Sequence, residues 1–379
     1  MWGSAPGFPV PFSLLCLKKM GEKKGHPKPS LVTLLRPLDF GGQARWAAGV
    51  SCMETWRPAL EQSFEQTLGN KFKIGWFEFK TKRLTMSAVL LDGRAMATRI
   101  REDIKKQIAV LPSLPGLAVL LVGDDPASHL YVDLKEKACQ EVGIRFEKQI
   151  YPADVSEEIL IKNILEWNAR LDIHGILLQL PLPHQNEDRI VATMDPHKDV
   201  DGFHPETIRR LEAGETCLLS PVVRGVFKLL EKTGRKMEGA TTAVVASPFF
   251  ARPFELLLQR AGASVSILSA NDPLLPQKTK TADLLLSAVG RPGLLTSAHI
   301  KPGAVVIDVG TTRVDNHVLG DADRTSVETV AGWLTPVPGG VGPMTVAMLL
   351  SNVVEAYASQ KNGGMWGGRK VGVQTRIFV

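Results

Sequence analysis

Residues 117–135 have the sequence LAVLLVGDDPASHLYVDLK, and the rest of the chain can be interpreted around them. The apolar run 117–123 is typical of a buried strand. Turn residues follow it, and Ser128 then offers an N-cap for a helix. On that helix Tyr131 and Lys135 are four residues apart and therefore share one face. The stretch predicts a phenol and an amine that project together beside the end of a strand.

Lys135 also fits a simpler interpretation, because most lysines are solvated and an amphipathic helix with an exposed lysine gives the same pattern. Three later stretches favour a site: LLQLPLP at 177–183, KDVDGFH at 198–204 and TPVPGGVGPMT at 335–345. With Tyr131 and Lys135, and in this order, they closely resemble the methylenetetrahydrofolate dehydrogenase/cyclohydrolase family. The resemblance extends from about residue 86 to about residue 361.

Apolar strand patterns alternate with helix patterns after residue 86, which predicts the α/β class and a parallel sheet covered on both faces. Ligands of such sheets bind at the carboxyl ends of the strands. The predicted strands are 117–122, 145–151, 173–178, 242–246, 264–268, 282–288 and 305–309, and the predicted helices are 95–110, 131–142, 156–170, 222–232, 253–261 and 344–358.

The resemblance implies a folate-binding α/β domain and a Rossmann-like dinucleotide-binding domain with a cleft between them. We expect the catalytic folate-binding domain at 86–220, completed by a C-terminal helix at 339–361. We expect the NAD(P)-binding domain at 221–338. Residues 362–379 form a Gly-rich tail outside the family pattern. Residues 1–85 are an atypical extension, and we expect Met86 to be the natural start.

Charge separates this extension from the rest. Residues 1–85 hold 13 of the 45 Lys and Arg residues and 6 of the 39 Asp and Glu residues, so the remaining 294 residues are nearly neutral. A basic nucleic-acid surface is therefore not indicated there. The extension lacks a span of about 20 apolar residues and so no membrane segment is indicated. We expect a cytoplasmic protein, with a mitochondrial presequence as the alternative if residues 1–85 are genuine.

The four cysteines are scattered as Cys16, Cys52, Cys139 and Cys217, a spacing that indicates neither a zinc site nor a disulfide framework. We therefore expect no metal. The resemblance implies a homodimer, a small-molecule folate substrate and no nucleic-acid or membrane partner.

The resemblance also assigns the folate site. It implies that Lys135 and Gln179 are catalytic, that Tyr131 stacks on the benzoyl ring of folate, and that Asp201 anchors the pterin. A carboxylate can accept two adjacent N–H donors from a pterin edge. A lysine held against an amide in a cleft can have a perturbed pKa and move protons. Further substrate contacts are implied at Gly342 and Pro343.

The coenzyme loop departs from the family pattern G-x-S-x-x-V-G-x-P, because Val245 and Ala251 replace the two glycines. Glycine lets backbone approach a pyrophosphate, so we expect weakened binding of NADP, or of NAD. Arg252 either reaches a phosphate or is a solvated arginine. The coenzyme contacts implied by the resemblance are Val245, Ala246, Ser247, Ser269, Ala270 and Thr311.

Two functions remain open from the sequence. One is a bifunctional enzyme that oxidises 5,10-methylenetetrahydrofolate with NAD(P)+ and hydrolyses the methenyl product to 10-formyltetrahydrofolate. The other is a cyclohydrolase, or a non-catalytic folate-binding protein, whose coenzyme domain has become structural. The intact Lys135 site favours activity, whereas the altered loop argues against assuming that NADP binds.

Overall fold

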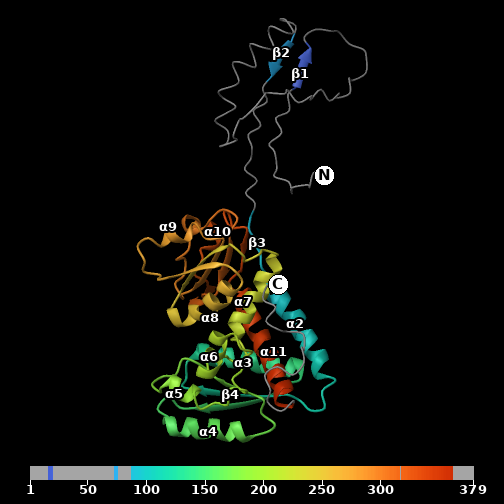
Figure 1. The fold of residues 1–379 in the computed structure, drawn as a ribbon, viewed down its shortest axis with the longest axis vertical. Coiled ribbons are helices and arrows are strands. Elements are labelled where there is room, and N and C mark those ends of the chain that lie inside the picture. The colour runs from blue at the N-terminus through green and yellow to red at the C-terminus, as the bar shows by residue number, and fades with distance from the viewer. Residues whose placement is uncertain (1–15, 20–71, 76–86, 316, 362–379) are drawn as a thin grey trace. The chain divides into compact units, whose positions relative to one another are not determined.

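Two parallel sheets organise the chain between residues 87 and 361 in the computed structural model (Figure 1). The structure describes residues 16–19, 72–75, 87–315 and 317–361. The chain divides into two units, Met1–Leu84 and Thr85–Val379. In the first unit, β1 (Cys16–Lys19) pairs antiparallel with β2 (Phe72–Gly75). The expectations for the rest of the extension and for the tail lie outside the described residues.

The first sheet has the order β5-β4-β6, and its central strand is buried along its whole length. Its strands are β4 (Gly116–Val122), β5 (Arg145–Tyr151) and β6 (Gly175–Leu178). Alternate β4 residues pack on opposite faces, as a strand period of two requires. One face packs against α2 (Gly93–Ile108), α3 (Pro126–Val142) and the C-terminal helix, and the other against α4 (Glu157–Ala169). Two short helices follow, α5 (Glu187–Val191) and α6 (Pro205–Ala213).

The second sheet has the order β3-β13-β10-β9-β7-β8, and every neighbouring pair is parallel. Its strands are β3 (Val89–Leu90), β7 (Thr241–Ala246), β8 (Ser264–Leu268), β9 (Leu284–Ala288), β10 (Val305–Asp308) and β13 (Trp333–Leu334). One face packs against α7 (Pro221–Thr233) and α8 (Pro248–Arg260). The connections contain α9 (Leu275–Thr279), η2 (Ser297–His299), α10 (Arg324–Val327) and the antiparallel pair β11 (Thr312–Val314) and β12 (His317–Leu319).

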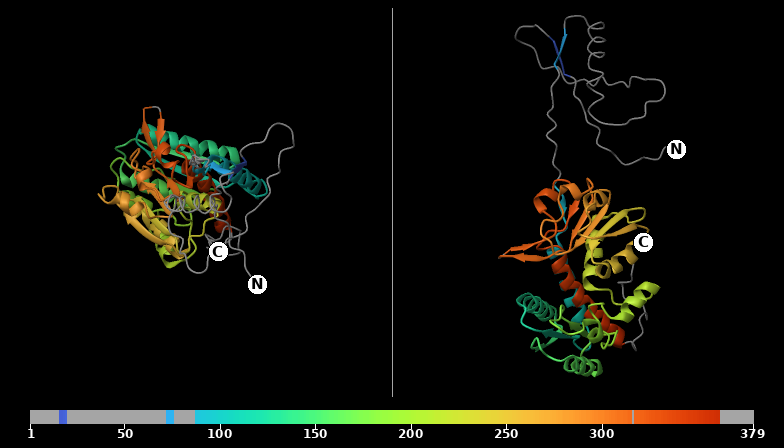
Figure 2. Two further views of the ribbon diagram at one scale, coloured as in Figure 1. Left: turned by 90° about the horizontal axis from the view of Figure 1, so that it is seen from above. Right: turned by 90° about the vertical axis from the view of Figure 1, so that its left-hand side faces the viewer.

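The long helix α11 (Val341–Lys361) joins the two sheets, because it packs against both α2 and α7 (Figures 1 and 2). Its first turns bury Met344 and Ala347 in the core under the second sheet. Its later turns bury Leu349 and Val353 under the first sheet. Among the described residues, α11 is long and apolar enough to cross a membrane by length and composition, but 56% of that apolar window is buried. This is the pattern of a core helix.

Two helices, α3 and α8, begin five residues before their predicted starts. Ser128 is not the N-cap of α3: Asp125 is, and its carboxylate accepts the Ser128 N–H at 2.9 Å. Proline suits the first helical position because it has no N–H to leave unpaired, so the helix begins at Pro126. For the same reason α8 begins at Pro248, five residues before the predicted start at Pro253.

Candidate functional site

Lys135 and Gln179 meet at the carboxyl edge of the first sheet. Lys135 lies on α3, which follows β4, and Gln179 follows β6, the strand that pairs with β4. The Lys135 Nζ donates to Gln179 Oε1 at 2.8 Å. The Gln179 amide is itself held, because its Nε2 donates to the Leu180 carbonyl at 2.9 Å. The pair is therefore preorganised, with the amide oxygen fixed on the amine.

Asp201 completes an electrostatic triad with this pair. Burial lowers the pKa of Lys135, and the nearby Asp201 carboxylate opposes that shift. Burial likewise raises the pKa of Asp201 to about 6, against the effect of Lys135. Both pKa values are thus shifted toward the neutral range, and a shift in that direction makes it easier for a group to gain and lose a proton near neutral pH. The arrangement can move a proton and can also bind a polar heterocycle.

The residues around Asp201 have structural partners, which leaves Asp201 available. Lys198 is buried and donates to three backbone carbonyls, including that of Arg170 at 2.7 Å. Asp199 accepts the N–H groups of Gly202 at 2.9 Å and of His204 at 2.8 Å. Among the described residues, none donates a hydrogen bond to the Asp201 carboxylate. Lys198 and Asp199 thus stabilise the local backbone, and the Asp201 carboxylate is left to accept hydrogen bonds from a ligand.

Glycine is required at position 202, where the backbone has φ +75°. A Cβ there would also lie 2.6 Å from the Ser220 backbone nitrogen. Both effects exclude a side chain at position 202, so the turn that follows Asp201 depends on glycine.

Tyr131 lies one turn before Lys135 on α3, and its side chain is 41% exposed. The ring is thus free to stack on a ligand. Gly342 and Pro343 lie in the first turn of α11. A Cβ on Gly342 would meet open space, and no described contact joins either residue to Lys135. Their role in substrate binding stays a prediction.

The predicted coenzyme residues gather at the carboxyl edge of the second sheet. Ser247 connects β7 directly to α8, and its Oγ accepts the Phe250 N–H at 3.3 Å as the N-cap. Ser269 and Ala270 follow β8, which pairs with β7. Thr311 is exposed between β10 and β11. A dinucleotide could lie across this edge, with phosphate at the helix N-terminus.

Neither position 245 nor position 251 has a backbone conformation that requires glycine. Val245 is fully buried within β7, and Ala251 is fully buried in α8. The described non-glycine residues include a single positive φ, that of Asp315. Val245 and Ala251 have ordinary strand and helix geometry, so neither residue strains the backbone. Weaker dinucleotide binding through loss of close backbone approach stays a prediction.

We therefore expect the double change Val245→Gly with Ala251→Gly to destabilise the protein. Removing a buried valine side chain costs about 2 kcal/mol, and glycine in a helix interior costs about 1 kcal/mol more than alanine. Urea denaturation should show a loss of about 3 kcal/mol. Unchanged stability together with tighter coenzyme binding would restore the original expectation.

Arg252 does not face a phosphate site in this structure. Its guanidinium pairs with Glu255 at 2.9 Å and with Glu212 at 3.2 Å. It is a surface residue of α8 that ties the helix to α6, which agrees with the simpler of the two interpretations.

One buried acid at the coenzyme edge was not foreseen from the sequence. Asp321 is fully buried and accepts the Ser287 hydroxyl at 2.6 Å, the Val289 N–H at 2.8 Å and the Arg291 N–H at 2.7 Å. It therefore fixes the turn after β9. A lone aspartate in a loop more than 30 residues away in sequence carries no local signal of this role.

A second carboxylate supports the same edge. Asp308, at the end of β10, accepts the N–H groups of Gly310, Asp321 and Ala322. Burial raises its pKa to about 7. Together these two acids hold the loops that surround the proposed coenzyme site.

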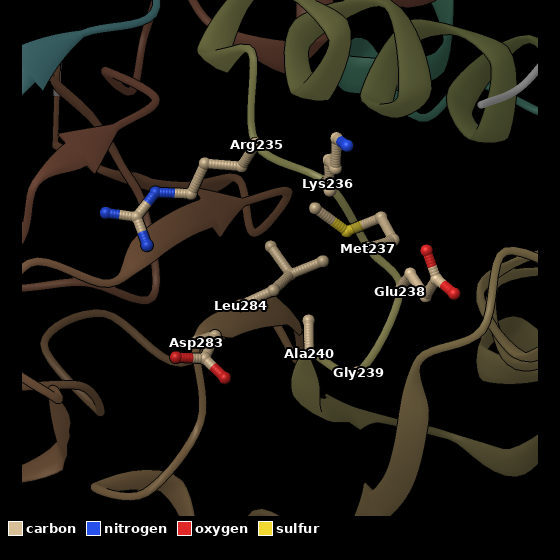
Figure 3. A pocket seen from close by; sticks show the side chains of 8 residues that line it. All are labelled: Arg235, Lys236, Met237, Glu238, Gly239, Ala240, Asp283 and Leu284. Atoms are coloured by element: carbon tan, nitrogen blue, oxygen red, sulfur yellow. The ribbon is translucent and has the colours of Figure 1, made fainter. Parts of the chain in front are cut away.

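A cavity of about 280 Å³ is shown in Figure 3, and none of its lining residues belongs to the folate site or to the predicted coenzyme contacts. It is lined by Arg235–Ala240 and by Asp283 and Leu284. Those residues precede β7 and begin β9, so the cavity lies at the amino edge of the second sheet. Parallel sheets bind ligands at the opposite edge, and we assign no role to it.

Comparison with known proteins decides the family. Residues 91–201 match the family model of the tetrahydrofolate dehydrogenase/cyclohydrolase catalytic domain. Residues 220–361 match the model of the tetrahydrofolate dehydrogenase/cyclohydrolase NAD(P)-binding domain. The chain belongs to the tetrahydrofolate dehydrogenase/cyclohydrolase family. Its NAD(P)-binding match includes α11, the helix that we had expected to complete the catalytic domain.

Relatives within the tetrahydrofolate dehydrogenase/cyclohydrolase family match over almost their whole length. The bifunctional protein FolD of Bordetella bronchiseptica is 44% identical over 277 residues, which are 72% of this chain and 98% of that protein. FolD of Halalkalibacterium halodurans is 45% identical over 276 residues, 72% of this chain and 99% of that protein.

Solved structures of tetrahydrofolate dehydrogenase/cyclohydrolase enzymes have the same fold as this chain. The bifunctional FolD of Campylobacter jejuni has a TM-score of 0.70 and 39% identity, covering 72% of this chain and 100% of its own. The Trypanosoma brucei dehydrogenase-cyclohydrolase, solved with NADP and an inhibitor, has a TM-score of 0.71 and 32% identity, covering 73% and 99%. The α/β fold and the NAD(P)-binding domain expected from the sequence are confirmed.

Proposed function

We propose that this chain oxidises 5,10-methylenetetrahydrofolate with NAD(P)+ and hydrolyses the methenyl product to 10-formyltetrahydrofolate. The observation that carries the proposal is the Lys135 Nζ to Gln179 Oε1 hydrogen bond of 2.8 Å beside the unpaired Asp201. The altered coenzyme loop no longer favours a cyclohydrolase alone, because Val245 and Ala251 have regular backbone geometry.

Substrate binding in this proposal uses Asp201 and Tyr131. The Asp201 carboxylate accepts two N–H bonds from the pterin edge, which fixes the register of the substrate. The exposed ring of Tyr131 stacks on the benzoyl group. The one-carbon bridge then lies toward Lys135, one helical turn further along α3.

The oxidised coenzyme supplies a hydride acceptor, and the oxidation leaves a cationic methenyl carbon. The chain contributes by positioning the two reactants, which is the main protein role in hydride transfer. Ser247, Ser269 and Thr311 lie at the sheet edge where a dinucleotide fits, and we propose them as contacts together with Val245, Ala246 and Ala270 through their backbone. The buried Val245 side chain takes no part.

Hydrolysis uses the Lys135 amine. Water adds to the cationic carbon and loses one proton, which leaves a carbinol. The ring C–N bond then breaks as its nitrogen gains a proton, while the carbinol oxygen loses its remaining proton to solvent and becomes the formyl carbonyl. A neutral Lys135 accepts the first proton and returns it as the ammonium form. Its lowered pKa makes the neutral form accessible, and Gln179 holds the amine at one place during both transfers.

The direct test follows both steps with the purified full chain. With 5,10-methylenetetrahydrofolate and NADP+ or NAD+, we expect reduced nicotinamide to appear by absorbance near its characteristic band. We expect the methenyl intermediate, supplied by itself, to decay to the formyl product. Hydrolysis without coenzyme reduction would leave the cyclohydrolase alone, and the absence of both would overturn the proposal.

We propose that the substrate is a small folate. We also propose that the protein is a homodimer in the cytoplasm. The near-neutral charge after residue 85 supports a partner other than nucleic acid. Sedimentation of the purified chain tests the dimer.

We expect the KM for folate to rise about tenfold between pH 7 and pH 5. The Asp201 pKa of about 6 means that its carboxylate becomes protonated in this window and loses acceptor capacity as pH falls. Asp201→Asn should raise KM at pH 7 and flatten the pH profile. Asp133→Asn is the control, because it removes an exposed carboxylate on α3 that pairs with Lys148. A wild-type profile in Asp201→Asn would contradict the role.

A further inference from the structure

Arg291 is an exposed arginine at the carboxyl edge of the second sheet, three residues after β9. Gly290, with φ +72°, forms the turn that precedes it. The Arg291 backbone N–H donates to the buried Asp321 at 2.7 Å, and the Val289 N–H donates to the same carboxylate at 2.8 Å. The buried Asp321 carboxylate therefore fixes the backbone from which the Arg291 side chain projects.

The guanidinium of Arg291 reaches the residues that follow β8. Its Nη1 donates to Asn271 Oδ1 at 2.8 Å and to the Ala270 carbonyl at 3.3 Å. Because β7 lies between β9 and β8 in the sheet, this side chain crosses the end of β7, where α8 begins. Within the described part of the chain, no acidic side chain forms an ion pair with it. The remaining guanidinium N–H donors are available to a ligand.

The acid next to this edge is already neutralised. Asp272 pairs with Lys278 at 2.6 Å and also accepts the Leu274 N–H at 2.8 Å, and these contacts lower its pKa. The first side chains after β8 are thus those of Ser269, Ala270 and Asn271, without a free carboxylate. In dinucleotide-binding sheets a carboxylate here accepts the 2′-hydroxyl of NAD, whereas an arginine accommodates the 2′-phosphate of NADP.

We propose that Arg291, positioned by Asn271, binds the 2′-phosphate of NADP and makes this chain prefer NADP over NAD. The inference rests on the proposed function, because it needs the coenzyme to lie across this edge. A guanidinium donates parallel N–H bonds to phosphate oxygens. The 2′-hydroxyl of NAD carries no charge, so the same arginine gains little from it.

The test measures binding rather than turnover. Dissociation constants of the full chain for NADP+, NAD+ and adenosine 2′,5′-bisphosphate are determined by isothermal titration. In Arg291→Gln we expect the constants for both 2′-phosphorylated ligands to rise about 10- to 100-fold, as loss of a charge-assisted hydrogen bond predicts. The constant for NAD+ should stay within about twofold.

Arg252→Gln is the matched control, because it removes another exposed arginine whose charge is already paired with Glu212 and Glu255. It should leave all three constants unchanged. Asn271→Asp is a second variant that places a carboxylate against the Arg291 guanidinium. It should weaken binding of NADP+ while NAD+ still binds.

The outcomes separate this inference from the proposed function. If NAD+ and NADP+ bind the unaltered chain equally well and Arg291→Gln changes neither, the dehydrogenase proposal stands and the Arg291 assignment is overturned. Equal weakening of both coenzymes in Arg291→Gln also overturns it, because the arginine would then support the loop in general. If the unaltered chain binds neither coenzyme, both the inference and the dehydrogenase function fail.

Discussion

Lys135→Met abolishes hydrolysis of the methenyl bridge while folate binding persists, if the amine is the proton carrier. Loss of a positioned acid–base group typically costs about 10²- to 10⁴-fold in rate. Methionine keeps the unbranched chain up to the ε position and removes the amine that donates to Gln179. The decay of methenyltetrahydrofolate absorbance gives the rate, and titration with the formyl product gives the binding constant.

Lys137→Met is the matched control for this change, because Lys137 is exposed on the same helix two residues further on. It should retain the wild-type rate. Near wild-type hydrolysis in Lys135→Met would remove the lysine from the mechanism. A loss of folate binding equal to the loss of rate would assign Lys135 to binding instead.

Asn352→Leu is expected to cause the largest loss of stability. Asn352 is fully buried in α11 and donates to the Val200 carbonyl at 2.8 Å and to the Leu219 carbonyl at 2.9 Å. Its Oδ1 accepts a hydrogen bond from the buried Arg224 on α7, which also pairs with Glu355 at 2.6 Å. One amide therefore connects two loops and a buried cation.

Leucine has a similar shape but satisfies none of these groups. Each orphaned buried polar group costs about 1–3 kcal/mol, and a buried charge that loses partners adds to this. We expect urea denaturation to report a loss of about 4 kcal/mol. Asn352 holds the carbonyl of Val200, the residue before Asp201. The variant protein that still folds should therefore also have a higher KM for folate.

Ser351→Ala is the comparison for Asn352→Leu. Ser351 lies on the same helix as Asn352, and its hydroxyl makes two long hydrogen bonds, with Arg224 at 3.4 Å and with Glu355 at 3.3 Å. We expect a change below about 1 kcal/mol. If Asn352→Leu unfolds at the same urea concentration as the unaltered chain, the buried amide does not hold the two domains' elements together in the way that its contacts indicate.

The local pattern of the sequence was sufficient for the elements that carry the folate site. An all-apolar run predicted β4, and the four-residue spacing placed Tyr131 and Lys135 on one face of α3, because strand and helix periods are local properties. The order of the three later stretches identified the family. The start of α3 was harder to predict, because Asp125 and Ser128 both have side chains that can cap a helix. Which of them is the N-cap depends on where the backbone turns into the helix, and in the structure it is Asp125.

Tertiary structure alone decided which side chains meet. Lys135 contacts Gln179 because β6 pairs with β4, and Arg291 reaches Asn271 because β8 and β9 flank β7. The tertiary structure also shows that Val245 is buried in the sheet, whereas the family resemblance assigned it to a phosphate-binding loop. Strand order and register depend on packing between residues far apart in the chain, so no local pattern of residue types contains them.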